Sequence, residues 1–161
     1  MSVRVQVVVN RSGEKHLRNW RIRRGAELPE FRRAGGDDYV DGKDGWVCVD
    51  EDYDQARAFY EGKLGFTFVA LTPFALLMRA GENLIRVVKM ADFVPLRSTV
   101  LGWEISDIEA VVGWLAERGV ETEKYPWVAD KERGIWTTPG GDKVAWFKDP
   151  DGNVLSVSQH R

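Results

Sequence analysis

A helix-start motif recurs in this chain after about 55 residues, and this internal repeat constrains the fold more than any other feature. Asp52 stands where a helix N-cap is expected, and Gln55 follows three residues later, as in a variant capping box. Ser106 and Glu109 form a Ser-x-x-Glu capping box, and Asp107 lies 55 residues after Asp52. A period of this length indicates two copies of one supersecondary unit.

Both expected helices carry an apolar stripe and end at a glycine, the residue favoured just after a helix C-terminus. These glycines are Gly65 and Gly119, which are 54 residues apart. We therefore expect two amphipathic helices, each with one buried side. The stripes are Ala56, Phe59, Tyr60 and Leu64 in the first helix and Ile108, Val111, Val112 and Leu115 in the second.

Strand-like runs surround both helices and give each unit the order βαβββ. We expect a tight turn at residues 149–153, Asp-Pro-Asp-Gly-Asn, with no role beyond joining two strands. Neither unit is large enough to bury its sheet alone, so residues 46–98 and 99–161 are expected to pair into one α+β body. The expected strands are 46–49, 66–71, 74–79 and 83–89 in the first unit, and 99–105, 120–127, 134–138, 143–148 and 154–158 in the second.

Residues 1–45 differ from the rest in charge. They contain ten Lys/Arg and seven Asp/Glu, whereas the remainder has a net charge of −5. A strand-like run at residues 3–9 precedes an Arg-rich stretch and two Gly/Asp clusters, which favours an arm with one or two strands against the main body. The alternative is a basic arm that binds nucleic acid or an acidic partner. The mixed acids and the lack of an aromatic stacking platform argue against nucleic acid.

Composition excludes several classes of protein. The 161-residue chain has one cysteine, Cys48, which rules out an internal disulfide framework and fits a reducing cytoplasm. No apolar run approaches the roughly 20 residues of a membrane span, and the first residues lack the apolar core of a signal peptide. A formal net charge of −2 gives no general case for nucleic-acid binding. We expect a cytoplasmic protein that does not act at a membrane.

Three segments carry a resemblance to a known family. They are residues 56–66, 103–120 and 147–153, with the sequences Ala-Arg-Ala-Phe-Tyr…Leu-Gly-Phe, Trp-Glu-Ile-Ser-Asp-Ile…Gly-Val and Phe-Lys-Asp-Pro-Asp-Gly-Asn. In this order and spacing they resemble the vicinal-oxygen-chelate superfamily, the glyoxalase, bleomycin-resistance and extradiol-dioxygenase group. The resemblance covers about residues 46–161. It implies two βαβββ modules in a U-shaped mixed sheet around a cleft that commonly holds a divalent metal, and usually a homodimer.

The resemblance also places the family's metal ligands on definite positions. Two lie seven residues before the helix-start aspartates, at Gly45 and Val100, and one lies three residues after the Asn of the final turn, at Ser156. A catalytic divalent metal needs at least three nitrogen or oxygen side-chain ligands, which these residues cannot supply. The two histidines of the chain, His16 and His160, lie in the arm and next to the C-terminus. We therefore expect no metal site and no cofactor.

A metal-free cleft of this family is expected to bind a small molecule, as drug-sequestering bleomycin-resistance proteins do. Because side chains alternate along a strand, Val100, Gly102 and Glu104 are expected to share one face. An aromatic rim around one acid would suit a planar or cationic ligand. The candidate ligand-binding residues are Trp103, Glu104, Tyr125, Trp127, Trp136, Trp146 and Ser156.

Other interpretations stay open. Tryptophans in so small a protein also serve as core or interface residues, and Glu104 could pair with an arginine across strands. The chain could be an enzyme, a lyase, isomerase or dioxygenase relative, that acts without metal and uses Glu104 as general base. It could also be an interaction module whose arm docks a partner.

Overall fold

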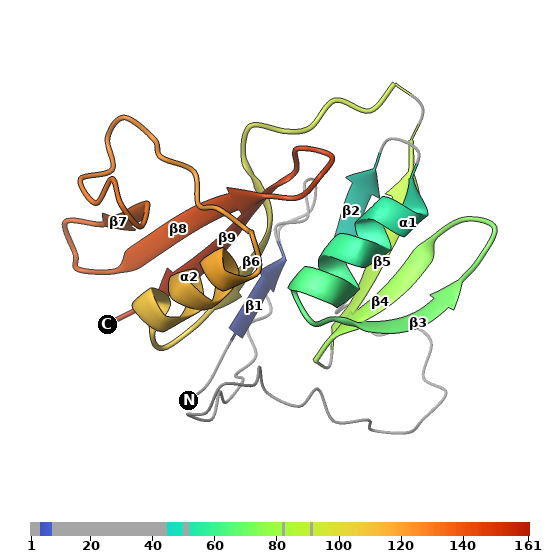
Figure 1. Ribbon diagram of the computed structural model, residues 1–161, viewed down its shortest axis with the longest axis horizontal. Helices are drawn as coiled ribbons and strands as arrows, with labels where there is room; N and C mark the ends of the chain where they lie inside the picture. The colour runs from blue at the N-terminus through green and yellow to red at the C-terminus, as the bar shows by residue number, and fades with distance from the viewer. Residues whose placement is uncertain (1–3, 8–44, 50–51, 82, 91) are drawn as a thin grey trace.

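The computed structural model describes residues 4–7, 45–49, 52–81, 83–90 and 92–161, with side chains from residue 52 onward. Two units of the expected order follow one another along the chain (Figure 1). No helix in these ranges is long and apolar enough to cross a membrane. Most of residues 1–45, including the Arg-rich stretch, lies outside the described residues.

The first unit is a four-stranded sheet with one helix. Its sheet has the order β2-β5-β4-β3, and β2 runs parallel to β5 while the other neighbours are antiparallel. The helix starts at the expected N-cap, where the Asp52 carboxylate accepts hydrogen bonds from two backbone N–H groups. The elements are β2 (Gly45–Val49), α1 (Tyr53–Arg57), its π-helical continuation η1 (Ala58–Lys63), β3 (Thr67–Leu71), β4 (Leu76–Ala80) and β5 (Asn83–Lys89).

The second unit repeats this topology, which confirms the two βαβββ units. Its strands have the order β6-β9-β8-β7, again with the first strand parallel to the last. A further strand, β1 (Arg4–Val7), pairs antiparallel with β6 and extends this sheet to five strands. The elements are β6 (Thr99–Glu104), α2 (Ile108–Glu117), β7 (Ile135–Thr137), β8 (Lys143–Lys148) and β9 (Val154–Gln159).

Two local expectations for the second unit were wrong. The N-cap of α2 is Asp107, whose carboxylate accepts from the Ala110 N–H, so Ser106 does not form the capping box. Glu109 instead makes an ion pair with Lys143 of β8. Residues 120–127 form no strand beyond one isolated bridge from Thr122, because the segment turns away into a long loop.

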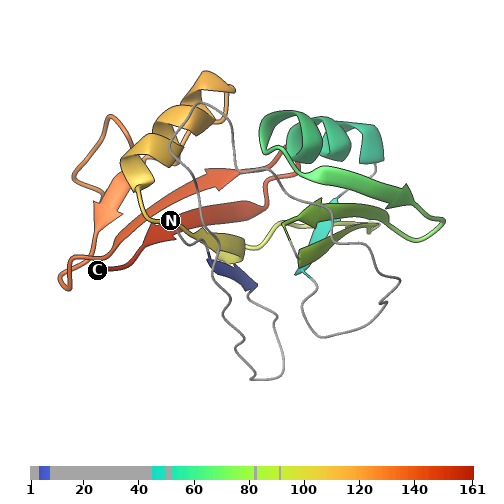
Figure 2. The ribbon, with the colours of Figure 1, turned by 90° about the horizontal axis from the view of Figure 1, so that it is seen from below.

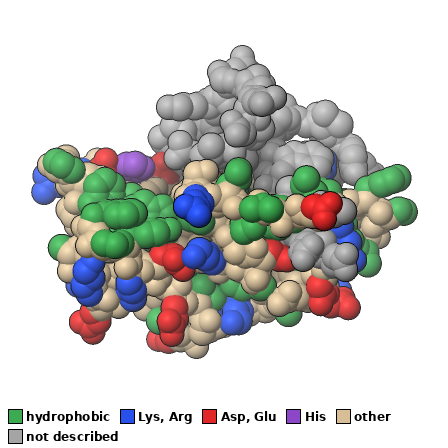
Figure 3. All heavy atoms as spheres, turned by 90° about the horizontal axis from the view of Figure 1, so that it is seen from above, with side chains coloured by type: hydrophobic (Ala, Val, Ile, Leu, Met, Phe, Trp, Pro, Cys, Tyr) green, Lys and Arg blue, Asp and Glu red, His purple; other side chains and the backbone are tan. Residues whose placement is uncertain are grey.

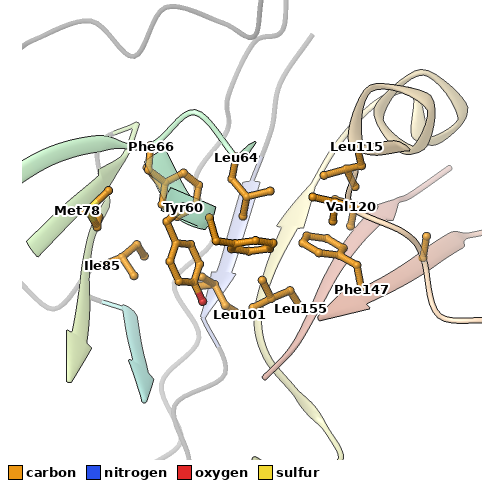
Figure 4. Close-up of a cluster of buried hydrophobic side chains, with 14 of the residues drawn as sticks. Tyr60, Leu64, Phe66, Met78, Ile85, Leu101, Leu115, Val120, Phe147 and Leu155 are labelled. Carbon is orange, nitrogen blue, oxygen red and sulfur yellow. The ribbon is translucent and has the colours of Figure 1, made fainter. Parts of the chain in front are cut away.

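One hydrophobic core joins the two units. Both helices lie on the same side of the two sheets (Figure 2) and bury their apolar stripes there. Figure 4 shows buried side chains of the first unit, such as Tyr60 and Phe66, beside Leu101, Phe147 and Leu155 of the second. The units therefore fold as one body, as their small size requires.

The turn at residues 149–153 does more than join two strands, which corrects the expectation for it. Gly152 adopts a φ of 85°, as the turn requires. Asp149 is buried at 4 % exposure, and its carboxylate accepts a 2.6 Å hydrogen bond from the Tyr60 hydroxyl of the first unit. It also accepts from the backbone and side chain of buried Asn153. The turn thus fastens the second unit to the first helix.

Candidate ligand-binding face

The sheet of the second unit has one side against α2 and one side away from it. Leu101, Ala145 and Leu155 point into the core with α2, so the residues that alternate with them lie on the opposite side, which we call the site face. Strand pairing puts these residues into two neighbouring rows. The rows are Trp146–Ser156–Gly102 and Trp136–Val144–Ser158–Glu104.

Four predicted residues form a continuous aromatic cluster at one end of the site face: Tyr125, Trp127, Trp136 and Trp146. The rings of Tyr125 and Trp127 stack at 4.7 Å with an interplanar angle of 4°. Trp146 meets Tyr125 edge-on at 5.6 Å and Trp136 at 6.1 Å. Trp127 is 62 % exposed, so its outer ring face is open to solvent. Hydrophobic side chains gather on the surface at this end of the molecule (Figure 3).

Trp146 is fixed in orientation. Its Nε1–H donates a 3.2 Å hydrogen bond to the hydroxyl of Thr99 on β6. With this donor occupied, the indole of Trp146 offers its ring surface to a ligand rather than its N–H. Thr99 was not among the predicted site residues.

Side-chain bonds to the backbone hold the loop of residues 121–134, which carries Tyr125 and Trp127. The Lys131 ammonium donates to the carbonyls of Tyr125 and Pro126, both at 2.8 Å. At its far end, Gly134 has a φ of 68°, and a Cβ there would lie 2.6 Å from the Thr122 hydroxyl oxygen. Any other residue at 134 would be strained and would displace the loop. The stacked pair is therefore held in place before a ligand arrives.

Trp103 does not join the predicted site. Its ring packs against the core and lies 6.3 Å from Phe147 and 5.8 Å from Phe66. The reason is strand alternation, which puts Trp103 and Glu104 on opposite faces of β6.

Glu104 lies on the site face, at the far end of its row from the aromatic cluster. It faces Ser158 on one side and the backbone of Arg4 in β1 on the other. Glu104 is half-buried and has an interaction partner in the protein.

The residues at the expected metal positions do not fit a divalent ion. A register irregularity between Thr99 and Leu101 turns Val100 toward the core, so Val100 does not share the face of Glu104 as expected. Gly45 has no side-chain donor, and Ser156 offers one neutral hydroxyl. Within the described ranges no group of three or more His, Cys, Asp and Glu could hold a metal ion. This donor set lacks the imidazoles and carboxylates that such ions prefer.

The sequence pattern did not predict Thr99 on the site face, and it placed Gly102 on this face without assigning it a role. Thr99 reaches this face only because the β6 strand is irregular beside it, which alternation cannot reveal. Gly102 is buried, and a Cβ there would lie 2.7 Å from the Ser156 hydroxyl oxygen. A glycine inside a strand pattern is a signal of close approach, and it could have identified this position.

Comparison with known proteins gives a family and a fold. The model of the Glyoxalase/Bleomycin resistance protein/Dioxygenase superfamily matches residues 46–157. A glyoxalase family protein from Enterococcus faecalis is 21 % identical, with a TM-score of 0.59 over 74 % of this chain and 98 % of that one. A glyoxalase/bleomycin resistance protein from Catenulispora Acidiphila is 23 % identical, with a TM-score of 0.55 over 73 % and 96 %.

A third solved structure carries an enzyme name. Lactoylglutathione lyase from Agrobacterium tumefaciens is 20 % identical, with a TM-score of 0.52 over 72 % of this chain and 90 % of that one. Identities at this level show a shared fold. No curated protein matches the chain.

Proposed function

Because the chain belongs to the glyoxalase/bleomycin resistance protein/dioxygenase superfamily, we propose that it binds a small planar molecule, aromatic or cationic, without a metal ion. The ligand lies against the aromatic cluster on the site face. The observation that carries this proposal is the unbroken series of rings from Trp127 through Tyr125 and Trp146 to Trp136. We expect the protein to act as a cytoplasmic homodimer.

The cluster offers a ligand both stacking and edge contacts. Trp127 already stacks on Tyr125 with nearly parallel rings, and Trp146 meets Tyr125 edge-on, so the cluster has ring faces and ring edges that a planar ligand can contact. Aromatic pairs of this kind are worth about 0.5–1.5 kcal/mol beyond the area they bury. A cationic ligand would gain a comparable amount from the electron-rich ring face, about 0.5–2 kcal/mol.

The fixed conformation of the loop of residues 121–134 increases the affinity for a ligand. Lys131 and Gly134 hold the backbone that carries Tyr125 and Trp127, so ligand binding does not have to order this loop. Ordering a single side chain on binding otherwise costs about 0.5–1.5 kcal/mol. A rigid aromatic surface is therefore suited to recognition of flat molecules.

Binding is better supported than catalysis or partner docking. The candidate base of a metal-free enzyme, Glu104, lies at the other end of its row from the aromatic cluster. The arm contributes β1 to the second sheet, which gives part of it a structural role. Within the described residues, neither alternative has an observation comparable to the aromatic cluster.

The test is a calorimetric titration of the full chain with proflavine, a planar aromatic cation. We expect Trp127→Ala to weaken binding by about 5-fold or more, because a base-like ring stacked on an aromatic side chain contributes about 1–3 kcal/mol. Trp127 is exposed, so this variant should fold normally.

Trp114→Phe is the matched control. Trp114 lies on α2 and contacts the Arg118 guanidinium, on the other side of the sheet from the site face. Proflavine should bind this variant as it binds the wild type. Equal affinity of wild type and Trp127→Ala, or no binding by the wild type, would contradict the proposed function.

A further inference from the structure

The row that contains Trp146 also contains a hydroxyl, from Ser156, and a glycine, Gly102. Strand pairing puts half-buried Ser156 directly between Trp146 and Gly102. Gly102 has no Cβ, and one built there would approach the Ser156 Oγ to 2.7 Å. The glycine therefore leaves the space that the Ser156 hydroxyl occupies.

The indole N–H of Trp146 and the hydroxyl of Ser156 differ in whether they already form a hydrogen bond within the protein. The Nε1–H of Trp146 is bound to Thr99, so this indole contributes no free donor. Among the hydrogen bonds formed by the described part of the chain, none uses the Ser156 side chain. A hydroxyl both donates and accepts, so Ser156 can pair with either kind of polar atom. Ser156 and Trp146 are paired on neighbouring strands, which lie about 5 Å apart in the sheet.

From this geometry we infer that Ser156 is the polar anchor of the ligand and that Gly102 keeps the anchor accessible. The ligand is then a planar heteroaromatic molecule with a hydrogen-bonding group at its ring edge. Its ring contacts Trp146 while its edge meets the Ser156 Oγ. This inference rests on the proposed function and narrows its ligand class.

Neither a turn nor a strained backbone conformation explains why residue 102 is a glycine. Gly102 lies inside β6, outside the set of glycines with positive φ. Alanine at 102 would therefore meet the Ser156 hydroxyl rather than backbone strain. The requirement for glycine comes from the space beside Ser156.

The experiment compares indole with 1-methylindole, two probes that differ in one ring N–H. Their dissociation constants are measured by NMR titration of the ¹⁵N-labelled full chain. The wild type should bind indole about 5- to 10-fold more tightly, as expected for one hydrogen bond in a partly buried site. Ser156→Ala should abolish this preference and leave 1-methylindole binding unchanged.

Two further variants test whether the Ser156 hydroxyl itself, rather than a general change in the structure, causes the preference for indole. Gly102→Ala should also reduce the preference for indole, because its Cβ displaces the Ser156 hydroxyl. Ser106→Ala makes the same change as Ser156→Ala at an exposed position before α2, and the preference should persist in it.

The outcomes distinguish this inference from the proposed function. Equal binding of the two probes by the wild type, or a preference that survives in Ser156→Ala, overturns the inference and leaves the proposed function standing. If neither probe nor proflavine binds the wild type, the proposed function falls and this inference falls with it.

Discussion

Replacing Asp149 with alanine is expected to lower the free energy of unfolding by about 3–4 kcal/mol, since hydrogen bonds to a charged group are worth about 1.5–3 kcal/mol each. The buried carboxylate accepts from the Tyr60 hydroxyl, from the Asn153 amide and from the Asn153 backbone. Alanine leaves these donors without their acceptor, and Tyr60 and Asn153 are themselves buried. The lost hydrogen bond from Tyr60 is the one that connects the two units.

Chemical denaturation monitored by circular dichroism measures this change. Asp142→Ala is the control, because Asp142 accepts hydrogen bonds near the C-terminus without being buried. We expect that variant to unfold close to the wild-type midpoint. Asp149→Ala should unfold earlier by about 10 °C in a thermal scan, at about 3 °C for each kcal/mol in a chain of this size. Similar stability of the two variants would show that the Tyr60–Asp149 contact does not hold the units together.

The second large effect is a loss of stability at alkaline pH that depends on Tyr60. Burial raises the pKa of the Tyr60 phenol well above its ordinary value, and the negative Asp149 carboxylate raises it further. The unfolded chain ionises this phenol near pH 10, while the folded chain keeps it protonated. The contribution of Tyr60 is therefore complete below pH 10 and is lost as the pH rises toward the folded pKa, at about 1.4 kcal/mol per pH unit.

Tyr60→Phe removes this dependence. At pH 8 the variant should be less stable than the wild type by about 1–2 kcal/mol, because Asp149 loses one donor. Above pH 10 the difference should shrink as the wild type loses stability, while the other three tyrosines affect both proteins alike. Urea unfolding at pH 8, 10 and 11 measures it, and parallel pH profiles for the two proteins would refute the assignment.

The sequence predicts the fold well because its signals are local. Asp52 caps its helix, and Gly65 and Gly119 adopt positive φ just after the two helices, as their positions indicate. A repeat of about 55 residues then fixes the order of strands, and the small size of each unit requires one shared core. None of these inferences needs knowledge of contacts between distant residues.

Contacts between residues far apart in the sequence determine the features that the sequence did not predict. The burial of Asp149 depends on Tyr60, 89 residues away, so a turn motif alone indicates no such role. The placement of Val100 and Thr99 depends on an irregularity in β6. The side of the sheet on which Trp103 lies, in contrast, follows from strand alternation. Trp103 and Glu104 are neighbours in one strand and point to opposite sides, so they could not both line the same site.

The aromatic cluster was predicted as a set of residues but not as an arrangement. Trp136 and Trp146 lie on paired strands, and their proximity follows from the sheet. Tyr125 and Trp127 were expected on or near a strand, whereas a loop fixed by Lys131 brings Tyr125 against Trp146 and Trp127 against Tyr125. Bonds from a lysine to backbone carbonyls leave no periodic signal in a sequence.

One titration tests most directly whether the site face binds a planar ligand without a metal ion. Proflavine is titrated by calorimetry into the full chain after dialysis against EDTA, and again with added zinc or nickel. We predict one binding event with the same affinity in all samples, and no heat from the metals alone, because Gly45 and Val100 carry no side-chain donor and Ser156 offers only a neutral hydroxyl. Proflavine binding that appears only with metal, or stoichiometric metal binding at this face, would contradict the account.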